Sequence, residues 1–157
     1  MRILIAAVAL LAVPSVASAQ STGVDGVVTS QMSLSLDQPA KGFPAFSKAK
    51  TYTTSLHTSV TATDGSMLLS ISDGDAASGS SRGHLKVGSK RLAAPLEATV
   101  GNAAFQPLDA SVDPLLKRWS VFGSNVAATI KLRQKVTAKA KGDYRKLVLV
   151  TLSTEMP

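Results

Sequence analysis

The stretch that decides the fold class runs from Thr51 to Thr63 and reads TYTTSLHTSVTAT. Its apolar side chains, including Tyr52, Leu56 and Val60, share one face, whereas His57 and a run of serines and threonines share the other. This period of two is typical of a β-strand that is buried on one face only. Beyond residue 20 no window shows apolar residues at helical spacing, so the sequence predicts an all-β protein.

Alternating segments on both sides of this stretch extend the prediction to about eight strands. Asp64-Gly65 is a strong signal for a two-residue hairpin between Thr51–Thr63 and the next strand, and Lys141-Gly142-Asp143 predicts a second hairpin near the end of the chain. We therefore expect a two-sheet antiparallel β-sandwich. The other expected strands are Gly26–Asp37, Met67–Ser72, His84–Val87, Leu92–Val100, Leu115–Phe122, Val126–Ala138 and Tyr144–Thr154. The expected core residues are Leu34, Leu36, Tyr52, Leu56, Val60, Leu69, Ile71, Ile130, Leu132 and Leu149.

The first nineteen residues have the pattern of a cleaved signal peptide. Arg2 precedes an apolar run that Pro14 interrupts, and Ala17-Ser18-Ala19 is a small-residue cleavage site. The sequence thus predicts residues 1–19 as a signal peptide, residues 20–157 as a single domain, and a secreted or extracytoplasmic location. The chain has no cysteine, which excludes disulfides, cysteine–zinc sites and a lipid anchor on cysteine. No later segment is long and apolar enough to span a membrane.

A series of short motifs follows in a fixed order along the chain: Leu34-Ser35-Leu36, Gly42-Phe43-Pro44, Lys50 to Ser55, Leu69 to Asp73, Gly83-His84-Leu85, Pro95-Leu96, Gln134, Gly142 to Lys146 and Thr151 to Thr154. This series resembles a family of immunoglobulin-like β-sandwich modules in secreted actinobacterial proteins. The resemblance implies an immunoglobulin-like sandwich outside the cytoplasm, with no catalytic activity assigned to the family. The pattern Trp119-Ser120-Val121, with Tyr144 and Thr151-Leu152, is more weakly similar to the WxL cell-wall-binding domains.

Residues that could support catalysis or metal binding are scattered. His57 and His84 lie in different segments without a second ligand at metal-binding spacing, and no nucleophile elbow is present. Asp109 and Asp113 could form a glycosidase pair, but they flank a proline-containing connection where aspartates usually cap turns. The segment Asp73–Asp75 could offer oxygens to calcium but lacks a full calcium-loop pattern. We therefore predict no enzyme activity, no cofactor and no metal.

The positive charge is concentrated in residues 131–146. This segment has seven basic side chains and one acidic one, whereas the rest of the predicted mature chain has nine of each. Such a patch suits an anionic cell-wall polymer or acidic glycan, and the alternative is a solvated face whose lysines protect a sheet edge. Nucleic acid is disfavoured by the predicted export and by the scarcity of aromatic stacking residues among the cations, where Tyr144 is the one aromatic side chain. The candidate binding residues are Lys131, Arg133, Lys135, Lys139, Lys141, Arg145 and Lys146.

These features predict a non-enzymatic secreted or cell-envelope module with a binding or structural role at the surface or wall. A second hypothesis is an assembly or accessory subunit that pairs with another exported protein through an edge strand. A small secreted hydrolase is disfavoured because the sequence shows no triad, dyad or metal set.

Overall fold

The structure is a computed structural model that describes residues 31–37, 42–63, 65–75, 78–120 and 123–155. The expectations for residues 1–30, which include the signal peptide and the beginning of the first expected strand, lie outside the described residues.

The described residues form ten strands, and all their pairings are antiparallel. A five-stranded sheet has the order β1 (Met32–Asp37), β2 (Lys50–Ala62), β9 (Gly123–Val136), β6 (Leu96–Val100) and β7 (Gln106–Pro107). A three-stranded sheet has the order β10 (Val148–Glu155), β3 (Ser66–Asp73) and β8 (Leu115–Trp119). A small hairpin joins β4 (Lys86–Val87) and β5 (Lys90–Arg91), and one short 3-10 turn, η1, covers Gly79–Ser81.

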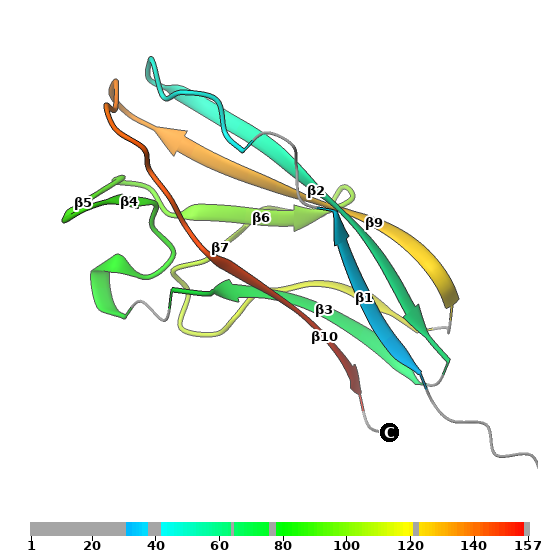
Figure 1. The fold of residues 1–157 in the computed structure, drawn as a ribbon. Helices are drawn as coiled ribbons and strands as arrows, with labels where there is room; N and C mark the ends of the chain where they lie inside the picture. Colours follow the sequence, from blue (N-terminus) through cyan, green and yellow to red (C-terminus); the bar gives the residue numbers. More distant parts are fainter. Residues whose placement is uncertain (1–30, 38–41, 64, 76–77, 121–122, 156–157) are drawn as a thin grey trace, which may run out of the picture.

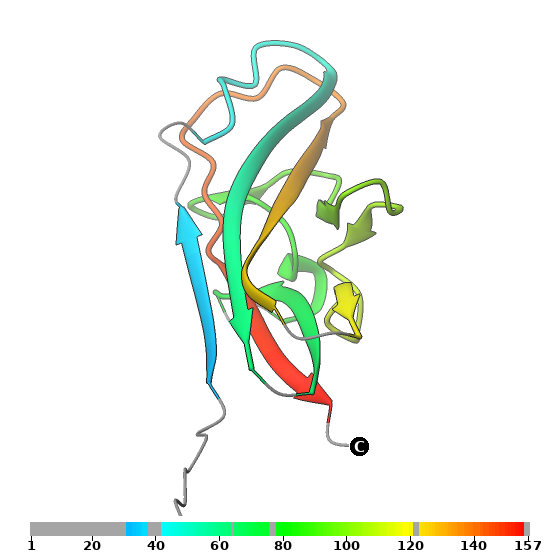
Figure 2. The ribbon, with the colours of Figure 1, turned by 90° about the vertical axis from the view of Figure 1, so that its right-hand side faces the viewer.

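The two larger sheets pack face to face, and the predicted antiparallel β-sandwich is confirmed. In Figures 1 and 2 the long strands β2 and β9 run across the layer formed by β3 and β10. The core between the layers includes Tyr52 from β2, Leu69 and Ile71 from β3, and Ile130 and Leu132 from β9. Apolar burial between these faces is the main force that holds the layers together.

The two predicted long hairpins are wrong. β2 and β3, which flank Asp64-Gly65, lie in different sheets, and so do β9 and β10, which flank Lys141-Gly142-Asp143. In both places the chain crosses from one sheet to the other instead of pairing with the strand that it has just left. Turn residues let a chain reverse direction, but the packing of the two layers decides which strand it then joins.

The charged strand β9 lies inside its sheet, not at an edge. It pairs with β2 along its length and with β6 from Ile130 to Gln134. The hypothesis that its lysines protect a sheet edge is therefore wrong for this strand. The expected facing is nevertheless correct, because Leu132 and Val136 are buried, whereas Lys131 and Lys135 are exposed.

The predicted core is correct for six of the ten residues, partly correct for Leu34 and Leu56, and wrong for Leu36 and Leu149. Leu36 is 42% exposed because β1 is an edge strand of a five-stranded sheet that faces only three strands. Leu149 is 57% exposed because Val148 and Val150, its neighbours in β10, are the residues that pack against the core.

Candidate anion-binding groove

A basic hollow lies beside the β4–β5 hairpin, next to the chain that leaves β9. Its volume is about 420 Å³, and no aspartate or glutamate is among the described residues that line it. The basic residues of its lining, which we call the groove cations, are Lys90, Arg91, Lys135, Lys139 and Lys141. Three of them belong to the predicted candidate set, and Lys90 and Arg91 were missed.

Backbone contacts place the two sides of the groove. The Ala140 N–H donates to the Phe46 carbonyl at 3.0 Å, which fixes the chain that carries Lys139 and Lys141. Farther along, Lys86 and Arg145 exchange two backbone hydrogen bonds of 2.9 and 3.0 Å, which attach the same chain to the hairpin. The hairpin itself turns at Gly88-Ser89, where Gly88 adopts a positive φ of 58° that favours glycine.

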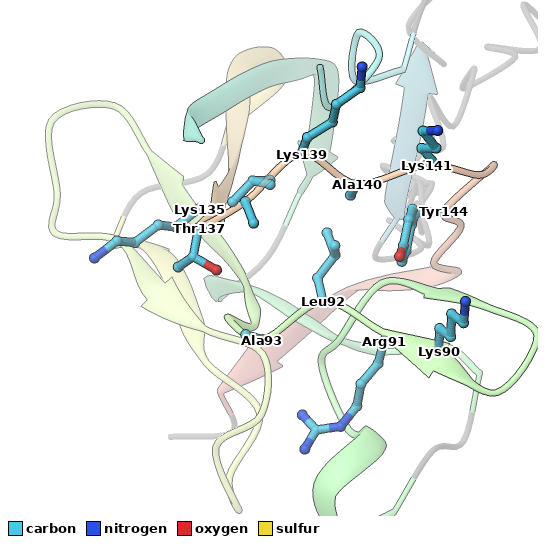
Figure 3. A pocket seen from close by; sticks show the side chains of 12 residues that line it. Lys90, Arg91, Leu92, Ala93, Lys135, Thr137, Lys139, Ala140, Lys141 and Tyr144 are labelled. Atoms are coloured by element: carbon cyan, nitrogen blue, oxygen red, sulfur yellow. The ribbon is translucent and has the colours of Figure 1, made fainter. Parts of the chain in front are cut away.

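The inner wall of the groove is apolar. Leu92 is buried, Ala140 and Tyr144 are half-buried, and the Tyr144 ring lies 6.2 Å from the Phe46 ring centroid. Figure 3 shows these side chains between the basic residues that contribute to the wall. A hollow with cations around an apolar wall suits a ligand that has both anionic groups and a carbon framework, such as a charged polysaccharide.

Four of the groove cations have free ammonium groups. Lys90, Lys135, Lys139 and Lys141 are exposed, and none forms an ion pair within the part of the chain that the structure describes. Arg91 differs, because its Nη1 lies 3.3 Å from both ring nitrogens of His84. Figure 3 accordingly shows the Arg91 side chain pointing away from Tyr144. The four lysines can therefore attract an anion without first breaking an ion pair.

Three other predicted candidates contact groups of the chain itself. The Lys131 ammonium donates to the Gly101 carbonyl at 3.3 Å. Arg133 forms an ion pair with Glu97 at 2.6 Å. Arg145 forms an ion pair with Asp143, and this hydrogen bond raises the pKa of the guanidinium. The predicted patch is therefore split, and its free cations are those that line the groove.

Lys146 lies apart from the groove, and its assignment to the surface patch is wrong. Its side chain is only 2% exposed, and its ammonium forms ion pairs with Asp73 and, at 3.1 Å, with Asp75. The two aspartates considered for calcium thus bind a cation from the chain itself. Burial alone would raise the pKa of Asp73, but hydrogen bonds from Lys146 and from the backbone N–H groups of Gly83 and Asp75 lower it below 3.8.

Of the remaining candidates, His84 and Asp113 have structural partners. His84 is buried and its Nδ1 lies 2.7 Å from the Leu92 carbonyl, whereas His57 is exposed, as expected for the polar face of its strand. Asp113 forms an ion pair with Arg82 at 2.7 Å. The described residues contain no group of three or more histidines, cysteines or acids placed to bind a metal.

Comparison with known proteins gives one structural similarity and no family. No protein-family model matches the chain, and no curated protein sequence matches it either. A solved structure, the CsuC–CsuE chaperone–tip adhesion subunit pre-assembly complex from archaic chaperone–usher Csu pili of Acinetobacter baumannii, matches with a TM-score of 0.46 and 13% identity. The match covers 78% of this chain and 39% of that chain. Within the described residues no helix has the length and apolar character needed to cross a membrane.

Proposed function

We propose that this protein is an exported, non-enzymatic β-sandwich module that binds an anionic polymer of the cell envelope through the groove cations. The observation that carries the proposal is a hollow lined by five cations with no acidic residue among its described lining. Like charges gathered at one site repel each other, and a bound polyanion relieves that repulsion.

The placement of the groove also supports an extended ligand. The groove lies between two exposed segments, the hairpin with Lys90 and the crossing chain with Lys139 and Lys141, so a polymer can pass between them. The apolar wall at Leu92 and Tyr144 adds contact area for a sugar ring or a polyol. Both ligand classes that fit the groove carry a repeating anionic group. This group is phosphate in a wall polymer and carboxylate in an acidic glycan.

The first prediction is salt-sensitive binding that depends on the groove. Lys139→Gln combined with Lys141→Gln should weaken binding by roughly two- to thirty-fold, because each exposed charge pair contributes about 0.2–1 kcal/mol. Binding to a poly(glycerol phosphate) and to a polygalacturonate should be measured by calorimetry at low salt and at several-fold higher salt, with neutral dextran alongside. Affinity should fall with salt because ions screen exposed charges over about 8 Å at physiological strength.

The matched control removes the same charge elsewhere. Lys117 and Lys131 are exposed and do not line the groove, so Lys117→Gln with Lys131→Gln should bind nearly as tightly as the unchanged protein. Equal weakening in both double variants would mean that only net charge matters. Absence of binding to either polyanion at low salt would refute the proposal.

A second candidate function is assembly with another exported protein through an edge strand. β1 and β10 are edge strands of the two sheets, and they expose large apolar side chains at Met32, Leu36 and Leu149. Edge strands with exposed apolar side chains can pair with an extended segment of a partner. This observation favours β-strand addition over a contact through the charged face.

The second prediction tests this assembly. Leu36→Lys with Leu149→Lys should abolish co-purification of a partner from envelope extracts, because charges on edge strands oppose strand addition. Val112 offers a matched control, since it is 77% exposed and lies outside the strands, so Val112→Lys should retain the partner. A partner that is retained by the double lysine variant would exclude these edges as its binding site.

A further inference from the structure

A buried amine and two carboxyl groups meet where β3 ends and β10 begins. The side chains of Lys146 and Asp73 are only 2% and 4% exposed, and their charged atoms are in contact. Asp75 Oδ2 lies 3.1 Å from the Lys146 Nζ. We propose that this cluster is a self-modification site, where Lys146 Nζ and Asp73 Cγ become joined by an amide bond.

The backbone holds the two reacting side chains together. Asp73 is the last residue of β3 and pairs with Val148, two residues after Lys146. The Gly74 N–H donates to the Leu147 carbonyl at 3.0 Å, so the chains on both sides of the pair are fixed to each other. Fixing two reactants in contact makes their reaction effectively unimolecular and removes much of its entropic cost.

The reactive protonation state is a minor form of the pair, since the lowered pKa of Asp73 keeps its carboxyl group mostly ionised. An ammonium is not a nucleophile and a carboxylate is a poor electrophile, but transfer of one proton from Nζ to Asp73 gives a neutral amine beside a carboxylic acid. Removal from water raises the free energy of the charged pair and so narrows the gap to the neutral pair, although the charged pair still prevails. The contact between Nζ and the Asp73 carboxyl lets this proton move without a carrier.

The bond then forms with loss of one water molecule. The lone pair of Lys146 Nζ attacks Asp73 Cγ and forms the C–N bond. The Asp75 carboxylate accepts a second proton from Nζ and delivers it to the hydroxyl on Cγ, and the C–O bond breaks as water leaves. Nζ keeps one of its three protons, Asp75 is regenerated, and no atom is oxidised or reduced.

Backbone donors stabilise the charge that develops on the carboxyl oxygens. The Gly83 N–H donates to Asp73 Oδ2 at 2.7 Å, and the Asp75 N–H donates to Asp73 Oδ1 at 3.0 Å. Donors that are already in place lower the energy of a tetrahedral intermediate. The Leu147 N–H holds the Asp75 carboxylate at 3.3 Å, which keeps the proton acceptor next to the amine.

The Lys146–Asp73 amide would take the role that a disulfide has in other proteins, since this chain has no cysteine. It would join the edge strand β10 to the central strand β3 of the same sheet at the end where β10 begins. A cross-link between distant parts of the sequence restricts the unfolded chain and so resists unfolding.

The third prediction concerns the mass of the purified protein. The intact chain should be lighter than its sequence mass by one water molecule, and Lys146→Arg should restore the full mass because a guanidinium is not acylated. After trypsin, residues 51–82 should be recovered covalently joined to the peptide that begins at Lys146. Asp75→Asn keeps the Lys146–Asp73 contact but removes the proton acceptor, so this variant, if folded by circular dichroism, should also have the full mass.

The Lys146→Arg variant also separates the amide from a succinimide at Asp73-Gly74, which loses the same water. A mass deficit that persists in Lys146→Arg would assign the loss to the succinimide and refute the proposal. A wild-type mass equal to the sequence mass would also refute the amide, and Lys146 and Asp73 would then form an ion pair only. In that case the stabilisation is present above pH 3.8 and is lost as the pH falls through the lowered pKa of Asp73.

Discussion

Lys146→Met should lower the free energy of unfolding by about 3–5 kcal/mol, because it leaves Asp73 buried without its cation. The methionine side chain has a similar length, so the change removes charge and hydrogen bonding with little change in volume. The Asp73 side chain is only 4% exposed and cannot recover the lost interaction from water. Urea denaturation followed by tryptophan fluorescence measures the loss. This loss of stability is expected whether Lys146 and Asp73 form an ion pair or an amide, since in either case the substitution removes the partner of Asp73.

Two variants make this expectation specific to the buried pair. Lys117 is exposed on β8, so Lys117→Met should change the free energy of unfolding by less than about 0.5 kcal/mol. Asp73→Asn combined with Lys146→Met should recover part of the lost stability, because no unpaired charge stays buried while the amide oxygen still accepts the Gly83 N–H. A single Lys146→Met variant that is as stable as Lys117→Met would show that the pair contributes nothing.

Leu132→Ala should cost about 2–5 kcal/mol of unfolding free energy, because it leaves a cavity between the two sheets. Leu132 is 6% exposed on the inner face of β9, paired with Thr54 of β2 and Ala98 of β6. Neighbouring strands on both sides limit how far the backbone can move to fill the space. Chemical denaturation should show a lower midpoint with an unchanged slope.

Lys131→Ala is the matched control for this strand. Lys131 is the residue before Leu132 and points to the opposite face, where its ammonium donates to the Gly101 carbonyl at 3.3 Å. Its replacement should change the free energy of unfolding by less than about 0.5 kcal/mol. Equal losses in the two variants would mean that the facing of β9 is inverted.

The groove was only partly predictable, since its two sides lie far apart in the sequence. Lys135, Lys139 and Lys141 were found because they belong to one basic segment. Lys90 and Arg91 were missed, although two adjacent cations beside the Gly88-Ser89 turn gave a local signal. The backbone pairing of Lys86 with Arg145 brings the hairpin to the basic segment, and neither local sequence reveals it.

Lys146 shows a second limit of sequence analysis. In sequence it is one more cation after Arg145, and nothing local separates the two. In the structure Arg145 is exposed beside Asp143, whereas Lys146 points inward to Asp73. The acidic partners lie some seventy residues earlier, so no spacing rule could connect them.

The sequence by itself determined the β class and the facing of the long strands, because a period of two assigns alternate side chains of one strand to opposite faces. It predicted the wrong inner face for β10, with Leu149 in the core, because Leu147 and Leu149 are as apolar as Val148 and Val150. Tertiary structure alone decided that choice and the pairing partner of each strand. The physical reason is that pairing and burial depend on contacts between residues distant in the chain, whose energies no local pattern encodes.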